Sequence, residues 1–182
     1  MFDEIENDTK ASMDKAIEVF ERDLTKLRTG RANLQMLDGI RVEYYGTPSP
    51  LSQVAALNIP DPRLITIKPW DKSLLIEIEK ALVGSNLGLT PNNDGGLIRL
   101  PIPPLTGERR KDLVKQLKRQ AEDARVVIRN ARRDANGEIK NVEGAGEDNQ
   151  HDALRSVQVL TDDAISRVDG ISDAKEKEIM EV

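Results

Sequence analysis

The strongest constraint on the fold of this chain is an apolar seam along residues 108–139. At about 100° per residue, the repeat of an α-helix, the apolar side chains of this stretch fall on one face. They are Leu113, Leu117, Ala121, Ala124, Ile128, Ala131, Ala135 and Ile139. A lone helix would leave such a face in water, so its burial requires other helices. The pattern therefore predicts one long helix that packs lengthwise in a bundle.

A stripe of positive charge accompanies this seam. Residues 105–140 contain eleven Lys or Arg and six Asp or Glu, although the whole chain has a net charge of −5. The cationic stripe, on which Asn136 also falls, comprises Lys111, Lys118, Arg125, Arg129 and Arg132. We expect the acidic residues on the opposite flank, at Asp112, Asp123, Asp134 and Glu138. A ridge of one sign suits a polyanion, and nucleic-acid phosphate is the obvious candidate.

The alternative interpretation of the cationic stripe is a solvated face with ion pairs inside the helix. A helix charged only for solubility interleaves opposite signs three or four residues apart. Because the expected positions of acids and bases are separated here, the binding interpretation is favoured. The acidic net charge of the chain also implies that contact with RNA is confined to the stripe.

Two further seams predict partner helices for residues 108–139. Residues 2–28 carry apolar side chains at alternating spacings of four and three, namely Met13, Ile17, Phe20, Leu24 and Leu27. After a Gly- and Glu-rich turn at residues 143–148, the last seam consists of Leu154, Val157, Thr161, Ala164, Val168 and Ile171. The simplest core for three such seams is an antiparallel three-helix bundle built from residues 1–29 and 106–182.

Residues 31–104 differ in character and form an insertion between the first two helices. All nine prolines lie in this range, together with β-like runs at residues 40–45, 64–68 and 97–100. Asp71 can cap a short helix that ends near Leu82, with Leu74, Leu75 and Ile78 facing inward. The predicted fold class is therefore α+β: a three-helix bundle with an inserted small β/α/β domain, elongated and hinged.

Two short connections join the predicted domains and would form the hinge. The first contains Thr29, Gly30 and Arg31, and the second contains Pro103, Pro104 and Leu105. Proline restricts the backbone, whereas glycine relaxes it.

Residues suited to catalysis are scarce. The chain has no cysteine and a single histidine, His151, and it lacks the glycine-rich loops that bind nucleotide phosphates. We therefore expect no enzyme activity, no metal and no cofactor. No run approaches the ~18 apolar residues of a membrane span, and the lack of cysteine fits a reducing compartment, so we expect a cytoplasmic protein.

Several strings occur together in one order. They read LRTGRA at 27–32, VEYYGTP at 42–48, LGL at 87–89, PPLT at 103–106, ERRK at 108–111 and VIRNARRDAN at 127–136. In order and spacing they closely resemble the bacterial ribosome recycling factor family, over essentially the whole chain. This resemblance implies a three-helix bundle that carries a β/α/β domain on a double hinge, with a tRNA-like outline.

The resemblance also implies a function. The family consists of translation factors that bind the post-termination ribosome and promote subunit dissociation together with elongation factor G, which hydrolyses GTP. By resemblance, the bundle contacts large-subunit rRNA through Arg129, Arg132 and Arg133, and Arg132 matches the most characteristic arginine of the family. Arg28 and Arg31 also match the family, although Arg28 could merely balance the dipole of the first helix. Arg125, Lys118 and Lys111 join the predicted site through the stripe alone.

Other interpretations remain open from the sequence. The chain could be a coiled-coil adaptor that binds a helical partner; a monomer, which we expect, would count against this. The turn at residues 143–148 is shorter than in many relatives, which leaves the length of the second helix open. Tyr44, Tyr45 and Trp70 could form either the small-domain core or partner contacts.

Overall fold

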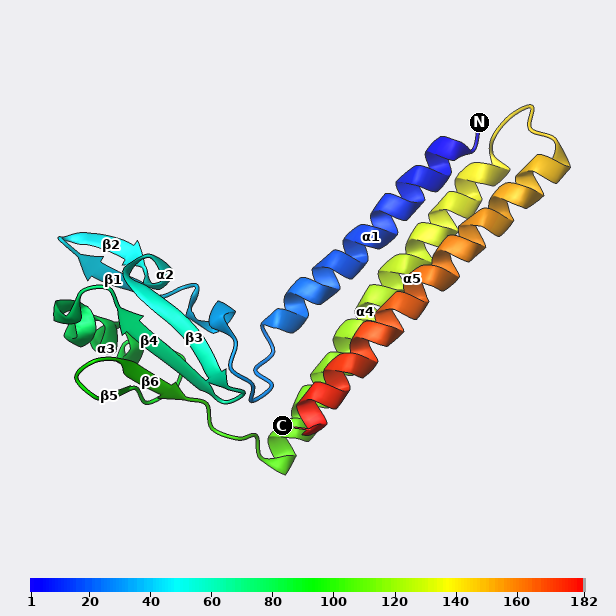
Figure 1. The fold of residues 1–182 in the computed structure, drawn as a ribbon. Helices are drawn as coiled ribbons and strands as arrows, with labels where there is room; N and C mark the ends of the chain where they lie inside the picture. The colour runs from blue at the N-terminus through cyan, green and yellow to red at the C-terminus, as the bar shows by residue number, and fades with distance from the viewer. Residues whose placement is uncertain (182) are drawn as a thin grey trace. The chain divides into compact units, whose positions relative to one another are not determined.

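The computed structural model describes residues 1–181, which divide into two compact units (Figure 1). A helical unit comprises Met1–Leu27 and Glu108–Glu181, and a sheet unit comprises Arg28–Gly107. The sequence predicted the boundaries between these units at residues 29–31 and 104–106. The last residue of the range predicted for the bundle, Val182, lies outside the described residues.

Three helices build the helical unit: α1 (Asp3–Thr25), α4 (Gly107–Lys140) and α5 (Glu147–Glu181). The chain runs along α1, returns along α4 and turns again at residues 141–146, so α4 is antiparallel to both neighbours (Figure 1). Gly144 in this turn has a φ of 76°, a conformation that favours glycine. The predicted antiparallel three-helix bundle is confirmed, and its second helix ends at Lys140.

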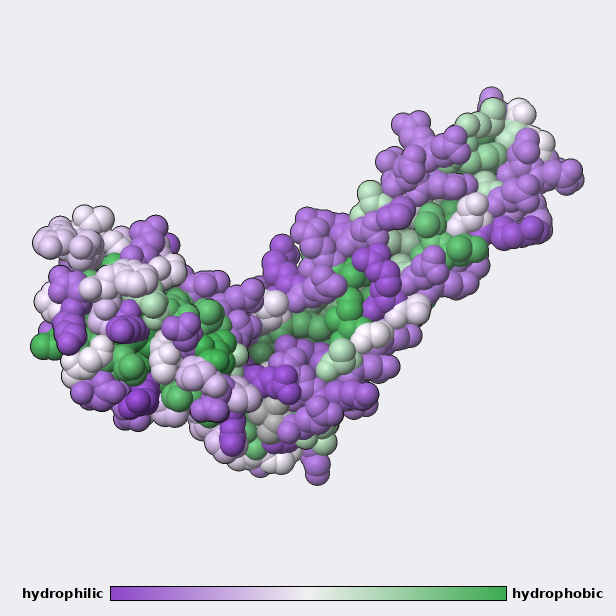
Figure 2. Space-filling view, in the orientation of Figure 1, coloured by the Kyte–Doolittle hydropathy of each residue, from purple (hydrophilic) through white to green (hydrophobic). Residues whose placement is uncertain are grey.

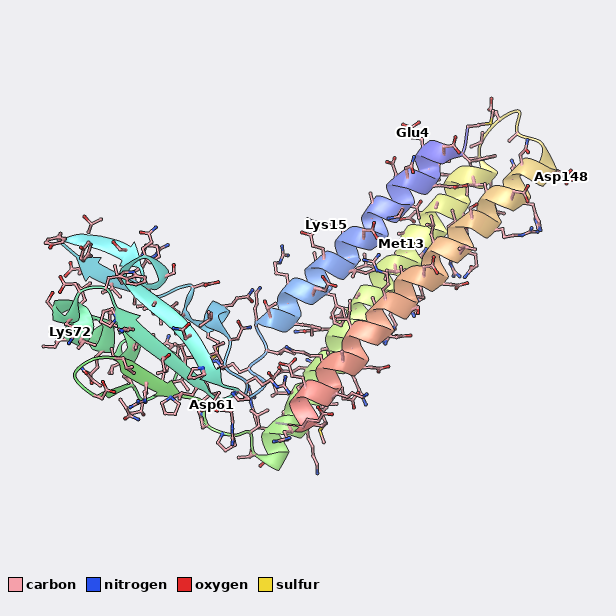
Figure 3. All side chains as sticks on the ribbon, in the orientation of Figure 1. Glu4, Met13, Lys15, Asp61, Lys72 and Asp148 are labelled. Carbon is pink, nitrogen blue, oxygen red and sulfur yellow. The ribbon has the colours of Figure 1, made fainter. Side chains whose placement is uncertain are left out.

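The predicted seams form the core of the helical unit. All predicted seam residues of α4 are buried except Ala131, which is half-buried, and Leu117 and Ile128 are fully enclosed. In α1, Met13 points toward the other helices and Lys15 points into solvent (Figure 3). Hydrophilic residues cover much of the visible helical surface (Figure 2). Leu154 and Ile171 are half-buried, and so is Leu27, which lies beyond the end of α1 at Thr25.

The sheet unit contains a four-stranded antiparallel sheet and a separate hairpin. The sheet has the order β3 (Ala55–Asp61), β4 (Leu64–Pro69), β6 (Ile98–Pro101) and β5 (Asn92–Asn93). The hairpin pairs β1 (Arg41–Tyr44) with β2 (Thr47–Pro50). Each β-like run predicted from the sequence contains a strand, whereas β2, β3 and β5 were not predicted.

Short helices complete the sheet unit: α2 (Leu51–Val54), α3 (Leu75–Val83) and two 3₁₀ turns, Leu34–Leu37 and Lys72–Leu74. Asp71 is a cap, since its Oδ1 accepts a hydrogen bond of 3.0 Å from the backbone N–H of Ser73, but it caps the 3₁₀ turn Lys72–Leu74 that leads into α3. Ile78 of α3 is fully buried and belongs to one apolar cluster with Ile65 of β4 and Ile98 of β6. The core of this unit is aliphatic.

Both connections between the units are irregular backbone. In the first, Thr29 and Gly30 are buried, and Gly30 has a φ of 79°. In the second, Pro103 and Pro104 are exposed and Leu105 is half-buried. The positive φ at Gly30 excludes proline there, because proline fixes φ near −65°. Motion at these connections stays a prediction.

Candidate nucleic-acid interface

The cationic stripe lies along α4, but Glu122 interrupts it. The Glu122 carboxylate accepts hydrogen bonds from both Arg125, at 3.3 Å, and Arg129. Glu122 precedes Arg125 by three residues and Arg129 by seven, so it lies on their side of the helix. The predicted separation of acids and bases is therefore wrong here. These two hydrogen bonds, that from Arg129 above all, lower the pKa of Glu122.

Helix α5 supplies further acids to the stripe. Asp169 Oδ1 accepts from Arg125 Nε at 2.9 Å and from Arg125 Nη2 at 2.6 Å. Lys118 Nζ lies 4.0 Å from Glu176 Oε1. Burial alone would lower the pKa of Arg125, but its hydrogen bonds to Asp169 and Glu122 outweigh burial and raise that pKa. Arg125 therefore links α4 to α5 as half of a helix-bridging ion pair.

Arg132 and Arg133 are held differently, by neutral amides. Arg132 Nη1 donates to Gln158 Oε1 at 3.1 Å, and Arg133 Nη2 donates to Asn130 Oδ1 at 2.9 Å. Among residues 1–181, no carboxylate lies within ion-pair distance of either guanidinium. An amide acceptor orients a guanidinium without cancelling its charge. The uncompensated charge of this part of α4 is thus concentrated at its two adjacent arginines.

The other predicted site residues have separate settings. Lys111 is exposed at the start of α4. Arg28 belongs to the sheet unit, where Nη1 donates to the carbonyl of Leu87 at 2.6 Å and Nη2 to that of Asn86 at 3.4 Å. Helix α1 ends at Thr25, so Arg28 binds these loop carbonyls and does not cap that helix. Arg31 is exposed in the first connection.

Comparisons with known proteins agree with one another. A family model described as "Ribosome recycling factor" matches residues 20–180. The ribosome-recycling factor of Geobacillus sp. (strain WCH70) is 51% identical, with 100% of each chain covered. That of Myxococcus xanthus (strain DK1622) is 54% identical, with 95% of each chain covered. The chain belongs to the ribosome recycling factor family.

Solved structures of this family share the fold. A solution structure of the ribosome recycling factor matches with a TM-score of 0.78 and 40% identity, covering 100% of this chain and 98% of the other. The Thermus thermophilus ribosome recycling factor, from models in which it and Escherichia coli elongation factor G are bound to the E. coli post-termination complex, matches with a TM-score of 0.64. Its identity is 43%, and 98% of each chain is covered. The predicted family and α+β fold class are confirmed, and the coiled-coil adaptor is not favoured.

The aromatic residues of the sheet unit are not part of its core. The exposed fractions are 86% for Tyr45, 72% for Trp70 and 37% for Tyr44. Tyr44 and Trp70 line a shallow pocket of about 150 Å³ together with Ser49 and Gln53. The interpretation of these residues as small-domain core is therefore wrong; their role as partner contacts in a ribosome recycling factor stays a prediction.

The described residues contain no group of three or more His, Cys, Asp or Glu side chains that could hold a metal ion. Within the same residues, no helix is both long and apolar enough to span a membrane.

Three residues that shape the interface were not predicted from the sequence: Glu122, Asp169 and Gln158. Glu122 could have been predicted, because the helical angle that assigns Arg129 to the stripe also assigns Glu122 to it. Asp169 and Gln158 lie on α5, and their contacts depend on the register of α5 against α4. Helical periodicity within one segment does not define the register between two segments.

Proposed function

We propose that this chain recycles post-termination ribosomes by binding large-subunit rRNA through its helical unit. The observation that carries the proposal is the charge of Arg132 and Arg133, whose guanidinium groups have only neutral amides as partners among the described residues. Membership of the ribosome recycling factor family supplies the biological setting.

Arginine suits an RNA contact at these positions. Its planar, permanently charged guanidinium can donate to two phosphate oxygens and can stack on an unpaired base. A phosphate that approaches Arg132 has to compete only with the amide oxygen of Gln158. At Arg125 it would have to displace two carboxylates. We therefore assign the main rRNA contact to Arg132 and Arg133, and a structural role to Arg125.

Within the proposal, the contribution of each remaining predicted cation to rRNA binding depends on how strongly a carboxylate already neutralises it. Arg129 shares the Glu122 carboxylate with Arg125, and Lys118 lies at the outer limit of an ion pair with Glu176. Exposed pairs of this kind are worth about 0–1 kcal/mol, so a phosphate can displace them. Lys111, Arg28 and Arg31 would add weaker, longer-range attraction to rRNA.

The proposal assigns the energy of subunit splitting to elongation factor G. A solved relative is bound to the post-termination complex alongside elongation factor G. We infer that elongation factor G hydrolyses GTP, acts on the sheet unit and displaces it at the two connections. The chain itself would then act in the cytoplasm as a binding protein, without catalysis, metal or cofactor.

The first test is co-sedimentation of the chain with purified large ribosomal subunits at stated salt concentrations. The Arg132→Ala variant should lose about 1–3 kcal/mol of binding free energy, the range for a charge-assisted hydrogen bond. Its salt dependence should also be shallower, with the slope of log K against log salt reduced by about 1.

Arg155→Ala is the matched control, since it removes one exposed arginine from α5 whose only described ion pair is 4.0 Å long. We expect this control to bind like the native chain. Native-like affinity in the Arg132→Ala variant, or equal losses in both variants, would refute the assignment of the rRNA contact to Arg132.

A further inference from the structure

Two ion pairs between α4 and α5 form a regular ladder. Lys118 pairs with Glu176 at 4.0 Å, and Arg125 pairs with Asp169 at 2.6 Å. From the first pair to the second, the position advances by seven residues on α4 and retreats by seven on α5. This is the repeat expected where antiparallel helices pack along a heptad seam.

The next step of the ladder would join Arg132 to Asp162. Arg132 follows Arg125 by seven residues, and Asp162 precedes Asp169 by seven. Across the described residues, however, no ion pair joins these two side chains. The ladder is interrupted at the arginine to which we assign the rRNA contact.

Gln158 occupies the missing step. Its Nε2 donates to Asp162 Oδ1 at 2.9 Å, and its Oε1 accepts from Arg132 Nη1 at 3.1 Å. Because the Asp162 carboxylate can only accept, it fixes the amide with its nitrogen toward the acid and its oxygen toward the guanidinium. One neutral side chain thus lies between two oppositely charged groups and hydrogen-bonds to both.

We propose that Gln158 is a positioning residue that keeps Arg132 out of an ion pair with Asp162 and leaves its charge available to an RNA phosphate. The inference rests on the proposed function of Arg132. It adds a residue that touches no RNA itself: the amide holds the guanidinium in place, which lowers the entropic cost of binding, without neutralising it.

The variant that tests the inference is Gln158→Ala. Alanine removes the bridge, raises helix propensity slightly and frees Asp162 to pair directly with Arg132. An exposed ion pair is worth up to about 1 kcal/mol, so affinity for large ribosomal subunits should fall about two- to fivefold. The salt dependence should become shallower, as in Arg132→Ala, while the thermal unfolding temperature should stay the same or rise.

Rescue distinguishes this mechanism from a simple loss of packing. The double variant Gln158→Ala with Asp162→Asn removes the competing carboxylate and should restore native affinity. The matched control combines Gln158→Ala with Asp163→Asn, which removes the same charge from the exposed neighbouring residue. This control should remain as weak as Gln158→Ala alone.

Three results would overturn the inference: native affinity in Gln158→Ala, a loss that Asp162→Asn does not restore, or equal rescue by Asp163→Asn. If Gln158→Ala perturbs the fold, Gln158→Met takes its place, because it keeps the length of the side chain. Gln158→Met should show the same loss of affinity. Arg132→Ala is measured alongside. If it also binds normally, the proposed function fails; if it alone is weakened, only the role of Gln158 fails.

Discussion

Tyr45 adopts a backbone conformation that a bulky side chain seldom takes. It has a φ of 48° and precedes Gly46, with a φ of 75°, at the tip of the β1–β2 hairpin. A two-residue hairpin loop with both φ values positive is the type I′ turn, which prefers asparagine, aspartate or glycine first. The tyrosine side chain is 86% exposed, so little burial offsets the strain.

Replacement of Tyr45 by asparagine should therefore stabilise the sheet unit. The left-handed conformation costs about 1–2 kcal/mol for a residue with a Cβ, and asparagine, whose short polar side chain can hydrogen-bond locally, should recover part of that cost. Chemical denaturation of Tyr45→Asn should show a higher free energy of unfolding than the native chain. Tyr44→Asn, at the end of strand β1, is the control and should give no gain. A less stable Tyr45→Asn variant would show that the ring makes contacts that outweigh the strain.

Helix α4 shows which parts of an element its sequence can predict. The burial of Leu117 and Ile128 follows from periodicity alone, because a face that recurs every three or four residues has to be covered. The ion pairs of Arg125 with Asp169 and of Lys118 with Glu176 do not follow, since they depend on the packing register of α5.

Strands were predictable only where alternation was clean. Strand β4 alternates buried Ile65 and Ile67 with less buried neighbours, as the sequence suggested. Strand β3 was missed because Asn58, Pro60 and Asp61 break the pattern, and its pairing with β4 shifts register between Asn58 and Asp61. The sequence left the role of Trp70 open for a different reason: aromatic residues usually contribute to cores, and only the structure shows that this one is 72% exposed.

The Glu122 carboxylate makes the stability of the helical unit depend on pH. Hydrogen bonds from Arg129 and then Arg125 lower its pKa below the ordinary value of 4.5. A carboxylate whose pKa is lowered in the folded state stabilises the fold fully at pH values above its ordinary pKa. This contribution is lost as the pH falls through the lowered pKa. Native protein and Glu122→Gln should therefore differ in stability at pH 7, with the variant less stable.

The difference should shrink as the pH falls below 4.5 and disappear once Glu122 is protonated in the folded native chain. Thermal unfolding at a series of pH values measures it. Asp134→Asn, which removes one exposed carboxylate from the same helix, serves as the control. A constant gap between native protein and Glu122→Gln across this range would contradict the role of the two arginines.

At the scale of the whole molecule, two connections carry all of the covalent linkage between the units. Pro103 and Pro104 restrict the second connection, because each fixes its own φ and constrains the residue before it. The proposed function requires that force on the sheet unit reaches the helical unit through such segments. A looser connection should therefore transmit that force poorly.

Replacement of both Pro103 and Pro104 by glycine should leave binding to large ribosomal subunits unchanged but slow subunit splitting. Light scattering of post-termination ribosomes with elongation factor G and GTP follows the splitting rate. Pro60→Gly, at an exposed site inside the sheet unit, provides the control. Native splitting rates in the double variant would indicate that stiffness at this connection is not needed.

The insertion of the sheet unit between α1 and α4 also affects the order in which the chain folds during its own synthesis. About 80 residues separate α1 from the first residues of α4, and at roughly 5–20 residues per second their translation takes about 4–16 s. The ion pair of Asp14 with Arg167 shows that α1 also depends on α5, the last helix to be made. The contiguous sheet unit can thus fold first. Until α4 and α5 have been synthesised, the apolar face of α1 is uncovered and accessible to chaperones.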